Sequence, residues 1–170
     1  MSSEHEVLFS SLSIKYNSEI RNILEIGTYN GVNALLLSNL FPNSNVHTID
    51  LSDDHHDFIN FYNRKKLSEN FIKERDKIIL ENKKITFNKM NSLNLINKKE
   101  KYDLIWIDGA HGYPVVCIDI INSLYLINNS GFILCDDVFL DLNYSMSDRM
   151  YNSIASYETL SELKKENLID

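Results

Sequence analysis

Acidic side chains follow several short apolar runs of this 170-residue sequence. Asp50 and Asp108 each end one such run, and the pair Asp136-Asp137 follows another. Apolar runs of this length, bounded by turn residues, predict buried strands. The carboxyl ends of parallel strands meet at one edge of a sheet, where ligands bind. Each acid alone is an ordinary turn residue, but together they predict several carboxylate oxygens around one crevice.

Strand and helix patterns alternate along the whole chain. The strands are almost wholly apolar, which is typical of a parallel sheet with helices on both faces. We therefore predict a doubly wound, mostly parallel α/β fold with about five strands, as a single domain over residues 1–170. The expected strands cover 22–26, 46–50, 85–90, 102–107 and 132–135, with a turn at 128–131; the expected helices cover 5–16, 32–40, 53–82 (one helix or a broken pair), 114–127 and 150–166.

The composition argues against two classes of partner. A net charge of −7 disfavours nucleic acid, because phosphate binding depends on clustered Lys and Arg. The basic-leaning stretch 64–84 has acids interleaved and predicts a solvated helix face. No apolar run approaches the ~20 residues that cross a bilayer, and Cys117 and Cys135 match no metal or redox spacing. We expect a cytoplasmic protein that binds neither nucleic acid nor membrane.

The first expected strand ends in a turn that contains two glycines, within I-L-E-I-G-T-Y-N-G-V-N. A dinucleotide-binding loop requires G-x-G-x-x-G, so that the backbone can approach a pyrophosphate. Here Tyr29 stands where the second glycine belongs, and the next glycine after Gly27 is Gly31. The resulting E-x-G-x-x-x-G spacing favours a ligand that has no pyrophosphate.

In their order and spacing these motifs resemble those of the class I S-adenosylmethionine-dependent methyltransferases, over about residues 22–138. The resemblance implies that the backbone at Gly27 passes close to the cofactor and that Asp50 accepts hydrogen bonds from the ribose hydroxyls. Glu25 would orient the loop or the methionine amino group, and Asn91-Ser92 would contact the adenine side. The complete implied set of cofactor-binding residues is Glu25, Gly27, Thr28, Tyr29, Gly31, Asp50, Leu51, Asn91, Ser92 and Asp108.

A narrower resemblance comes from D-G-A-H-G-Y after the fourth expected strand and G-F-I-L-C-D-D-V at the fifth. These stretches are similar to those of the metal-dependent O-methyltransferases related to the macrocin type, which act on sugar hydroxyls. The resemblance implies that Asp108, Asp136 and Asp137 hold a divalent cation, with Mg²⁺ favoured. It also implies catalytic roles for His111, as general base, and for Asp108.

The chemistry of methyl transfer to a hydroxyl calls for such groups. The sulfonium methyl is already activated, so the protein must align the hydroxyl oxygen with it and remove the hydroxyl proton. A histidine, with an ordinary pKa near ~6.5, can take that proton at neutral pH. An oxygen-ligated cation would lower the pKa of the acceptor and offset the repulsion among three carboxylates. The acceptor would be a hydroxyl of a small molecule or a glycan.

Simpler roles stay open for several of these residues. Asp136-Asp137 could cap the loop that follows, and His111 could only hydrogen-bond a carboxylate. His55-His56 is expected to face solvent, and His5 carries no signal.

The chain departs from the seven-stranded sheet that the resemblance implies. Only about thirty residues follow Val138, and they predict a loop and a helix. We therefore expect the last two strands to be lacking, which leaves the fifth strand as an edge that proteins normally cover. A homodimer, or the final helix folded over that edge, would cover it.

Two other functions are also compatible with the sequence. The chain could be a non-catalytic cofactor-binding or interaction module that kept the site and lost turnover. It could also be a nicotinamide-dependent oxidoreductase on a similar sheet, although Tyr29 and the G-x-x-x-G spacing count against that.

Overall fold

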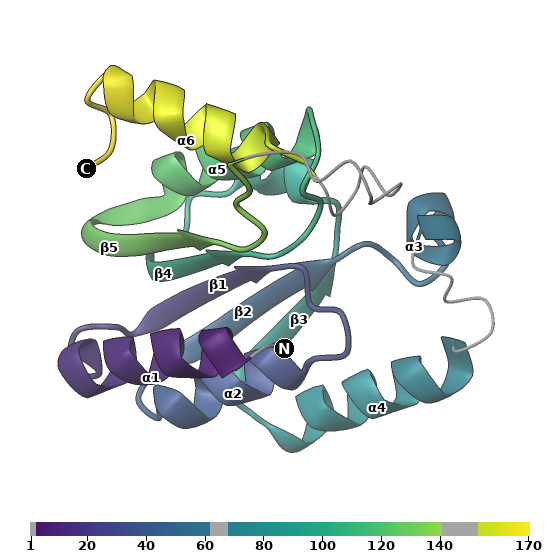
Figure 1. The fold of residues 1–170 in the computed structure, drawn as a ribbon. Coiled ribbons are helices and arrows are strands. Elements are labelled where there is room, and N and C mark those ends of the chain that lie inside the picture. Colours follow the sequence, from purple (N-terminus) through teal and green to yellow (C-terminus); the bar gives the residue numbers. More distant parts are fainter. Residues whose placement is uncertain (1–2, 62–67, 141–152) are drawn as a thin grey trace.

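The computed structural model describes residues 3–61, 68–140 and 153–170, and its centre is one parallel β-sheet. The five strands are β1 (Asn22–Ile26), β2 (Asn45–Asp50), β3 (Ile85–Lys89), β4 (Tyr102–Ile107) and β5 (Ile127–Cys135). They lie in the order β3-β2-β1-β4-β5, and every neighbouring pair is parallel (Figure 1). The strand order reverses beside β1, which is where such sheets bind ligands. The predicted fold class is confirmed.

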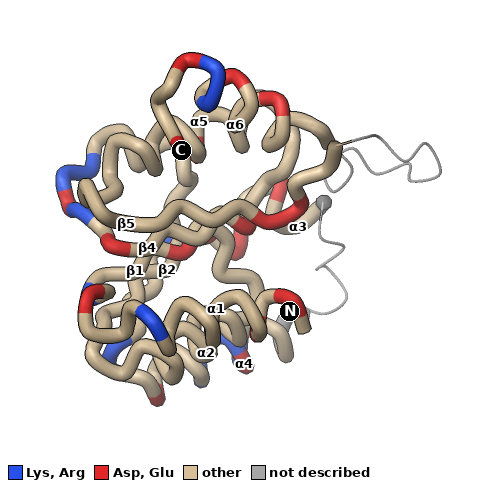
Figure 2. The backbone as a smooth tube through the Cα atoms, turned by 60° about the vertical axis from the view of Figure 1, so that its left-hand side comes forward, with Lys and Arg blue, Asp and Glu red and all other residues tan. Residues whose placement is uncertain are grey.

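Helices cover both faces of the sheet (Figures 1 and 2). One face carries α1 (Ser3–Tyr16), α2 (Val32–Leu40) and α4 (Ser68–Glu81), and the other carries α5 (Val115–Leu126) and α6 (Ala155–Lys165). Alternate residues of β4 belong to the two cores. Leu104 and Trp106 join the cluster beneath α1 and α2, and Ile105 and Ile107 join the cluster beneath α5 and α6. Burial on both faces explains why the strands lack polar alternation.

Two short helices follow strand ends near the reversal point. The expected helix 53–82 is two helices, α3 (His56–Phe61) and α4, and residues 62–67 between them lie outside the described residues. The short 3₁₀ helix η2 (Ser92–Asn97) was not predicted. It begins where the Asn91 side chain accepts a hydrogen bond from the Leu93 N–H at 2.9 Å, an ordinary N-cap contact.

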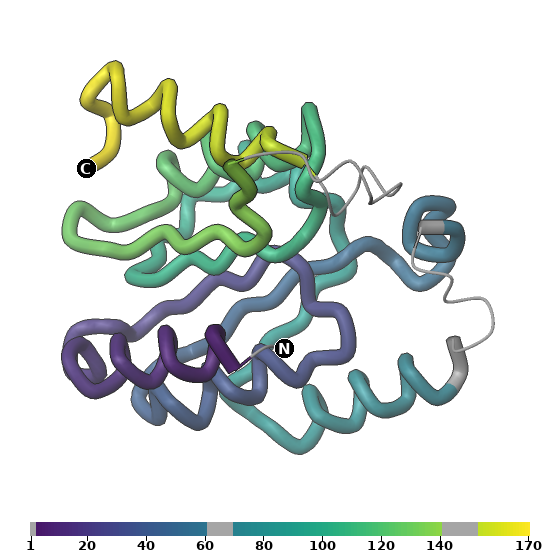
Figure 3. Tube along the Cα trace, in the orientation of Figure 1, coloured from purple at the N-terminus to yellow at the C-terminus, as the bar shows by residue number. Residues whose placement is uncertain are grey.

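The C-terminal part differs from the prediction in two details. The expected turn at 128–131 belongs to β5, where the pairing with β4 shifts register between Tyr102 and Leu104. Beyond β5 the described residues contain the helix α6 and no strand, while residues 150–152 of the expected helix lie outside the described part. The chain begins and ends on opposite faces of the sheet (Figure 3).

The helix α6 packs against α5. The Tyr113 hydroxyl donates to the Glu158 carboxylate at 2.7 Å, and the Thr159 hydroxyl meets the Cys117 sulfur at 3.0 Å. Among the described helices, none is long and apolar enough to span a bilayer. The homodimer remains a prediction.

A buried carboxyl group links β1 to its neighbours behind the glycine turn. Glu25 is fully buried; its Oε1 accepts from the Asn33 amide at 2.7 Å, and its Oε2 accepts from the Thr48 hydroxyl at 2.5 Å. The Thr48 hydroxyl also lies 2.6 Å from that of Thr28, inside the turn. Burial raises the pKa of Glu25 to about 7, although both hydrogen bonds oppose the shift. The carboxyl therefore connects β1, β2 and α2 at the cost of burying an acid.

We expect Glu25→Gln to flatten the pH dependence of stability between about pH 4.5 and about 7. The ordinary pKa of 4.5 applies in the unfolded chain and the raised pKa of about 7 in the folded chain, so the folded state binds more protons in this window. The free energy of unfolding therefore falls as pH rises through it, by on the order of 3 kcal/mol for this one group. Glutamine cannot titrate, so the variant should lose that slope.

Urea unfolding at several pH values measures this slope. Glu166→Gln is the matched control, because Glu166 is exposed just beyond α6. Equal slopes for Glu25→Gln and the wild type would contradict the buried, proton-binding role.

Candidate active site

A cavity of about 340 Å³ lies at the carboxyl ends of β1 to β4. Its wall contains five residues that the resemblance assigned to cofactor binding: Gly27, Asp50, Leu51, Asn91 and Ser92. The fold thus brings three separate segments of the sequence together around one space. The other lining residues had been given no cofactor role, although four of them belong to the D-G-A-H-G-Y stretch: Ile26, Ile49, Asp57, Met90, Gly109, Ala110, Gly112, Tyr113 and Val115.

Gly27 lets the loop after β1 pass directly against the end of β4. Its φ is +103°, and a Cβ built there would lie 2.1 Å from the Asp108 carbonyl oxygen. No side chain fits at that distance, and the backbone conformation itself favours glycine. The Gly27 N–H donates to the Ile49 carbonyl at 2.9 Å, and the Asp108 N–H donates to the Ile26 carbonyl at 2.8 Å. These bonds connect the ends of β1, β2 and β4 where the cavity opens.

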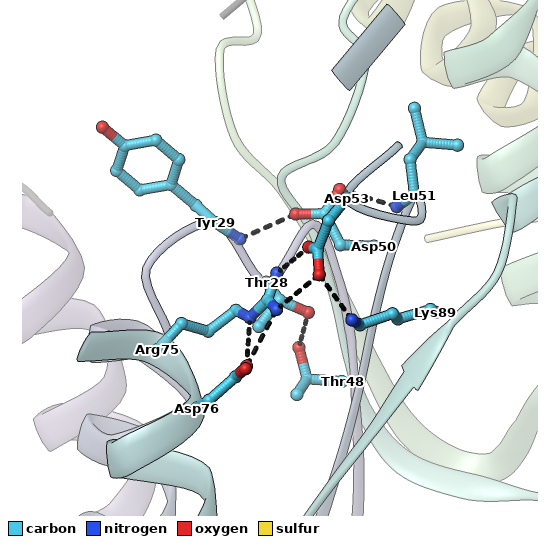
Figure 4. Close-up of polar contacts among 9 residues, drawn as sticks. All are labelled: Thr28, Tyr29, Thr48, Asp50, Leu51, Asp53, Arg75, Asp76 and Lys89. Carbon is cyan, nitrogen blue, oxygen red and sulfur yellow. Dashed lines mark hydrogen bonds and ion pairs between the residues drawn. The ribbon is translucent and has the colours of Figure 1, made fainter. Parts of the chain in front are cut away.

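The Asp50 carboxylate joins the loop after β1 to the loop after β2 (Figure 4). Its Oδ2 accepts from the Tyr29 N–H at 2.9 Å, and its Oδ1 accepts from the Leu51 N–H at 2.8 Å. Tyr29 has a φ of +48°, which is uncommon for a residue with a side chain. The two hydrogen bonds therefore fix both the carboxylate and the turn opposite it.

The remaining residues of the implied cofactor set lie outside the cavity wall. Thr28 is buried with Glu25 and holds the turn from behind. The Tyr29 ring points away from Asp50 (Figure 4) and contacts the Phe71 ring, with centroids 4.9 Å apart. Gly31 has a φ of +76° and precedes α2. These residues shape the loop after β1. Asp108, the last member of the implied set, also lies outside the cavity wall, directly after β4.

Three carboxyl groups and one imidazole gather beside the cavity. The Nε2 atom of His111 lies 3.5 Å from Asp137 Oδ2 and 3.9 Å from Asp108 Oδ1. Asp136, which follows β5, is close enough to Asp108 to shift its titration. His111 is 3% exposed and is not part of the cavity wall, although Ala110 on one side of it and Gly112 on the other are. The structure therefore brings the four predicted residues together behind that wall.

Burial controls the protonation of this group. It raises the pKa of Asp108 to about 8, with further increases from Asp136 and Glu25. It raises the pKa of Asp137 as well, against the opposing effect of His111. Burial lowers the pKa of His111, although Asp137 and Asp136 favour its charged form. At neutral pH Asp108 therefore holds a proton and His111 is a neutral imidazole.

His5 reaches the same group from the other end of the chain and was missed by the sequence analysis. Its Nε2 lies 2.9 Å from Asp136 Oδ1, and its ring meets the Trp106 ring edge-on, with centroids 5.0 Å apart. The two hydrogen-bonded residues are 131 positions apart. No local pattern could have predicted that contact, because it depends on how α1 packs beneath the sheet.

The donor atoms fit a hard divalent cation, because carboxylate oxygens are the ligands that such cations prefer. Burial and the neighbouring Asp136 raise the pKa of Asp108 and of Asp137, and a cation bound among these groups would lower both pKa values. Within the described ranges, however, no three His, Cys, Asp or Glu side chains are arranged to hold a metal ion. Asp136 is engaged by His5. The metal site therefore stays a prediction.

Residues 64–67 of the basic-leaning stretch 64–84 lie outside the described part, and the rest is a solvated helix face only in part. Arg75 lies within it and is fully buried, so the prediction is wrong for this residue. Its guanidinium hydrogen-bonds Asp53 and Asp76 and lies over the Phe87 ring. Arginine is retained inside proteins where its donors are paired in this way.

Comparison with solved structures gives the same fold. A Staphylococcus aureus protein assigned as a caffeoyl-CoA O-methyltransferase has a TM-score of 0.65 at 19% identity, over 99% of this chain and 74% of that one. An SAH-bound Podospora anserina methyltransferase has 0.63 at 19% identity, over 100% and 71%. An O-methyltransferase from Bacillus cereus in complex with SAH has 0.59 at 20% identity, over 95% and 70%. At these identities the similarity concerns the fold.

The sequence itself carries the family assignment. A search among curated proteins finds no match. A family model described as a methyltransferase domain matches residues 24–138, a range that contains the glycine turn, the cavity wall and the acids after β4 and β5. Because this match covers more than half of the chain, the protein belongs to the methyltransferase domain family.

Proposed function

We propose that this protein is an S-adenosylmethionine-dependent O-methyltransferase that acts on a hydroxyl group of a small molecule or a sugar. The observation that carries the proposal is the cavity wall, where Gly27, Asp50 and Asn91-Ser92 meet at the strand-order reversal. Two structural neighbours bind S-adenosylhomocysteine, the product form of this cofactor. The family match favours methyl transfer over hydride transfer to a nicotinamide.

The residues around the cavity suit an adenosine group at one end. Asp50 can accept from the two ribose hydroxyls while its existing bonds to backbone N–H groups hold it in place. Ile49, Leu51 and Met90 supply apolar surface for the adenine. The Asn91 side-chain oxygen caps η2, which leaves its amide nitrogen as the donor for a base edge. The cavity lies against Gly27 and Gly109, where only backbone separates it from the ends of β1 and β4.

His111 is the proposed general base, and this role requires the acceptor hydroxyl to reach its ring past Ala110 and Gly112, which line the cavity on either side of it. Burial keeps its pKa below the ordinary value, so the imidazole is neutral at pH 7 and can accept a proton. Asp137 Oδ2, at 3.5 Å, would stabilise the imidazolium that forms. Asp137 also has a φ of +48°, and such strained residues concentrate at functional sites. Proton removal is needed because a sugar hydroxyl is a weak nucleophile.

A divalent cation is the finer part of the proposal. Asp108, Asp136 and Asp137 would hold it, with Mg²⁺ favoured, and Asp136 would exchange its contact with His5 for the metal. When bound, such an ion would orient the acceptor oxygen and lower the pKa of its proton. The macrocin-type branch, the sugar acceptor and the homodimer belong to the same level of proposal.

We expect wild-type protein to bind S-adenosylhomocysteine with micromolar affinity in calorimetry. Asp50→Ala should weaken this binding roughly 10- to 100-fold, because it removes charge-assisted hydrogen bonds to the ribose and the hydrogen bond from the Tyr29 N–H that holds the turn. Asp54→Ala is the matched control, since Asp54 is exposed four residues further along the same loop and does not line the cavity. Absence of binding in the folded wild type would refute the proposed function.

We expect His111→Gln to lower kcat by roughly 10²- to 10⁴-fold, because it removes the proton acceptor. Binding of S-adenosylhomocysteine should stay unchanged, since His111 lies outside the cavity wall. The assay follows S-adenosylhomocysteine release from the methyl donor with a panel of hydroxyl acceptors, beginning with sugars. The control is His56→Gln, at a side chain that is 81% exposed. Unchanged turnover would remove His111 from the mechanism, and cofactor binding without turnover on any acceptor would favour the non-catalytic module.

Metal binding can be tested without an acceptor. We expect Mn²⁺, titrated into the protein and followed by electron paramagnetic resonance, to bind the wild type and to bind Asp137→Asn at least about tenfold more weakly, because a charged ligand is lost. Asp57→Asn, at an acid on the cavity wall but outside the cluster, is the control. Absence of bound Mn²⁺, together with turnover that is indifferent to EDTA, would leave a metal-independent methyltransferase.

A further inference from the structure

We propose that Arg75 is a positioning residue for the cofactor site, which acts by tying the loop that carries Asp50 to helix α4. The inference rests on the proposed function and adds a residue that lies outside the cavity wall. The guanidinium of Arg75 is buried and pairs with Asp53 on the loop after β2 (Figure 4).

The guanidinium of Arg75 contacts two carboxylates and one aromatic ring. Its Nη1 donates to Asp53 Oδ1 at 2.7 Å and its Nη2 lies 3.3 Å from Asp53 Oδ2, so the two groups pair side by side. Its Nε and Nη2 donate to Asp76 Oδ1 at 3.0 and 2.8 Å. The Cζ atom lies 4.5 Å from the centre of the Phe87 ring on β3. A planar fork with this many partners fixes its neighbours more strictly than a single charge would.

Asp53 transmits this constraint to the cofactor loop. Asp53 lies three residues after Asp50, on the same loop. Asp50 and Leu51 line the cavity. Lys89, at the end of β3, also pairs with Asp53. Burial alone would push the pKa of Asp53 upward, but the hydrogen bonds from Arg75 and Lys89 lower it below its ordinary value. The carboxylate therefore stays charged and anchored at neutral pH.

The same helix supports the opposite loop. A Cβ built on Gly31 would lie 3.6 Å from the Arg75 Cγ, so the stem of the side chain packs against the end of the glycine turn. One turn earlier in α4, Phe71 contacts the Tyr29 ring. The Tyr29 N–H and the Asp50 carboxylate are the two halves of the hydrogen bond that joins the loops. Arg75 therefore stabilises both sides of the contact that orients Asp50.

The second carboxylate of the cluster provides an internal control. Asp76 bonds the same guanidinium but is adjacent to Arg75 on α4 and is 52% exposed. Removing Asp76 takes away one of the two acids that bind Arg75 and leaves the pairing of Arg75 with Asp53 intact. Removing Asp53 also takes away one acid, and it breaks the contact between α4 and the loop after β2. The two variants thus separate positioning of the loop from the general cost of disturbing a buried charge.

The test is calorimetry with S-adenosylhomocysteine, with melting temperatures measured in parallel. Asp53→Ala is expected to weaken binding about tenfold, and Asp76→Ala to change it less than about twofold. Arg75→Lys, which keeps the charge and loses the fork, should resemble Asp53→Ala and provides a second route if that variant unfolds.

A double-mutant cycle with Asp50→Ala tests whether Arg75 and Asp53 affect cofactor binding through Asp50. If Arg75 and Asp53 act through Asp50, adding Asp53→Ala to Asp50→Ala should cost less than about twofold more, because the interaction is already lost. Equal losses for Asp53→Ala and Asp76→Ala, no loss for Asp53→Ala, or full additivity with Asp50→Ala would each overturn the inference. Wild-type protein that fails to bind would instead refute the proposed function.

Discussion

The close approach of the turn after β1 to the end of β4 is the constraint on which the site depends. At Gly27 the two backbones are so near that a Cβ would overlap the Asp108 carbonyl oxygen. The strand order reverses between β1 and β4, so that β2 lies beyond β1 on one side and β5 lies beyond β4 on the other. One contact between two backbones therefore positions both the cavity wall and the acid group, which consists of Asp108, Asp136, Asp137 and His111. Glycine leaves room here for the backbone that follows β4, so the two strand ends meet with no side chain between them.

The negative charges of four aspartates near this contact are offset in four different ways. Asp50 accepts from backbone N–H groups, and Asp53 pairs with Arg75 and Lys89. Asp136 meets His5, and Asp108 holds a proton because burial raises its pKa to about 8. Hydrogen bonds from backbone N–H groups fix the Asp50 carboxylate on the cavity wall, and Arg75 and Lys89 lower the pKa of Asp53. In the proposed function, a cation would replace the proton of Asp108 and the contact of Asp136 with His5.

The sequence predicted the features that depend on local composition. Apolar runs bounded by turns located β1 and β4 to the residue, and the acids after them were placed at the correct edge because parallel strands share it. The helix η2 was missed because its start depends on one side-chain cap at Asn91 rather than on apolar periodicity. Arg75 was assigned to a solvated face because interleaved charges are usually exposed, and its burial follows from partners on other elements.

The proposed cofactor site and the proposed acceptor-activating side chains lie on different parts of the chain. All described residues that line the cavity lie between Ile26 and Val115, at the ends of β1 and β2, in the loops and short helices that follow β1 to β4, and at the start of α5. The acid group adds Asp136 and Asp137, which follow β5, and Asp136 contacts His5 from α1. The cavity wall therefore draws on the first four strands and the start of α5, whereas the acidic residues Asp136 and Asp137 depend on the packing of β5, and their neighbour His5 on that of α1. In the proposed function, a change near β5 would act first on the acceptor side, and the contacts of Arg75 lie wholly on the side of the proposed cofactor site.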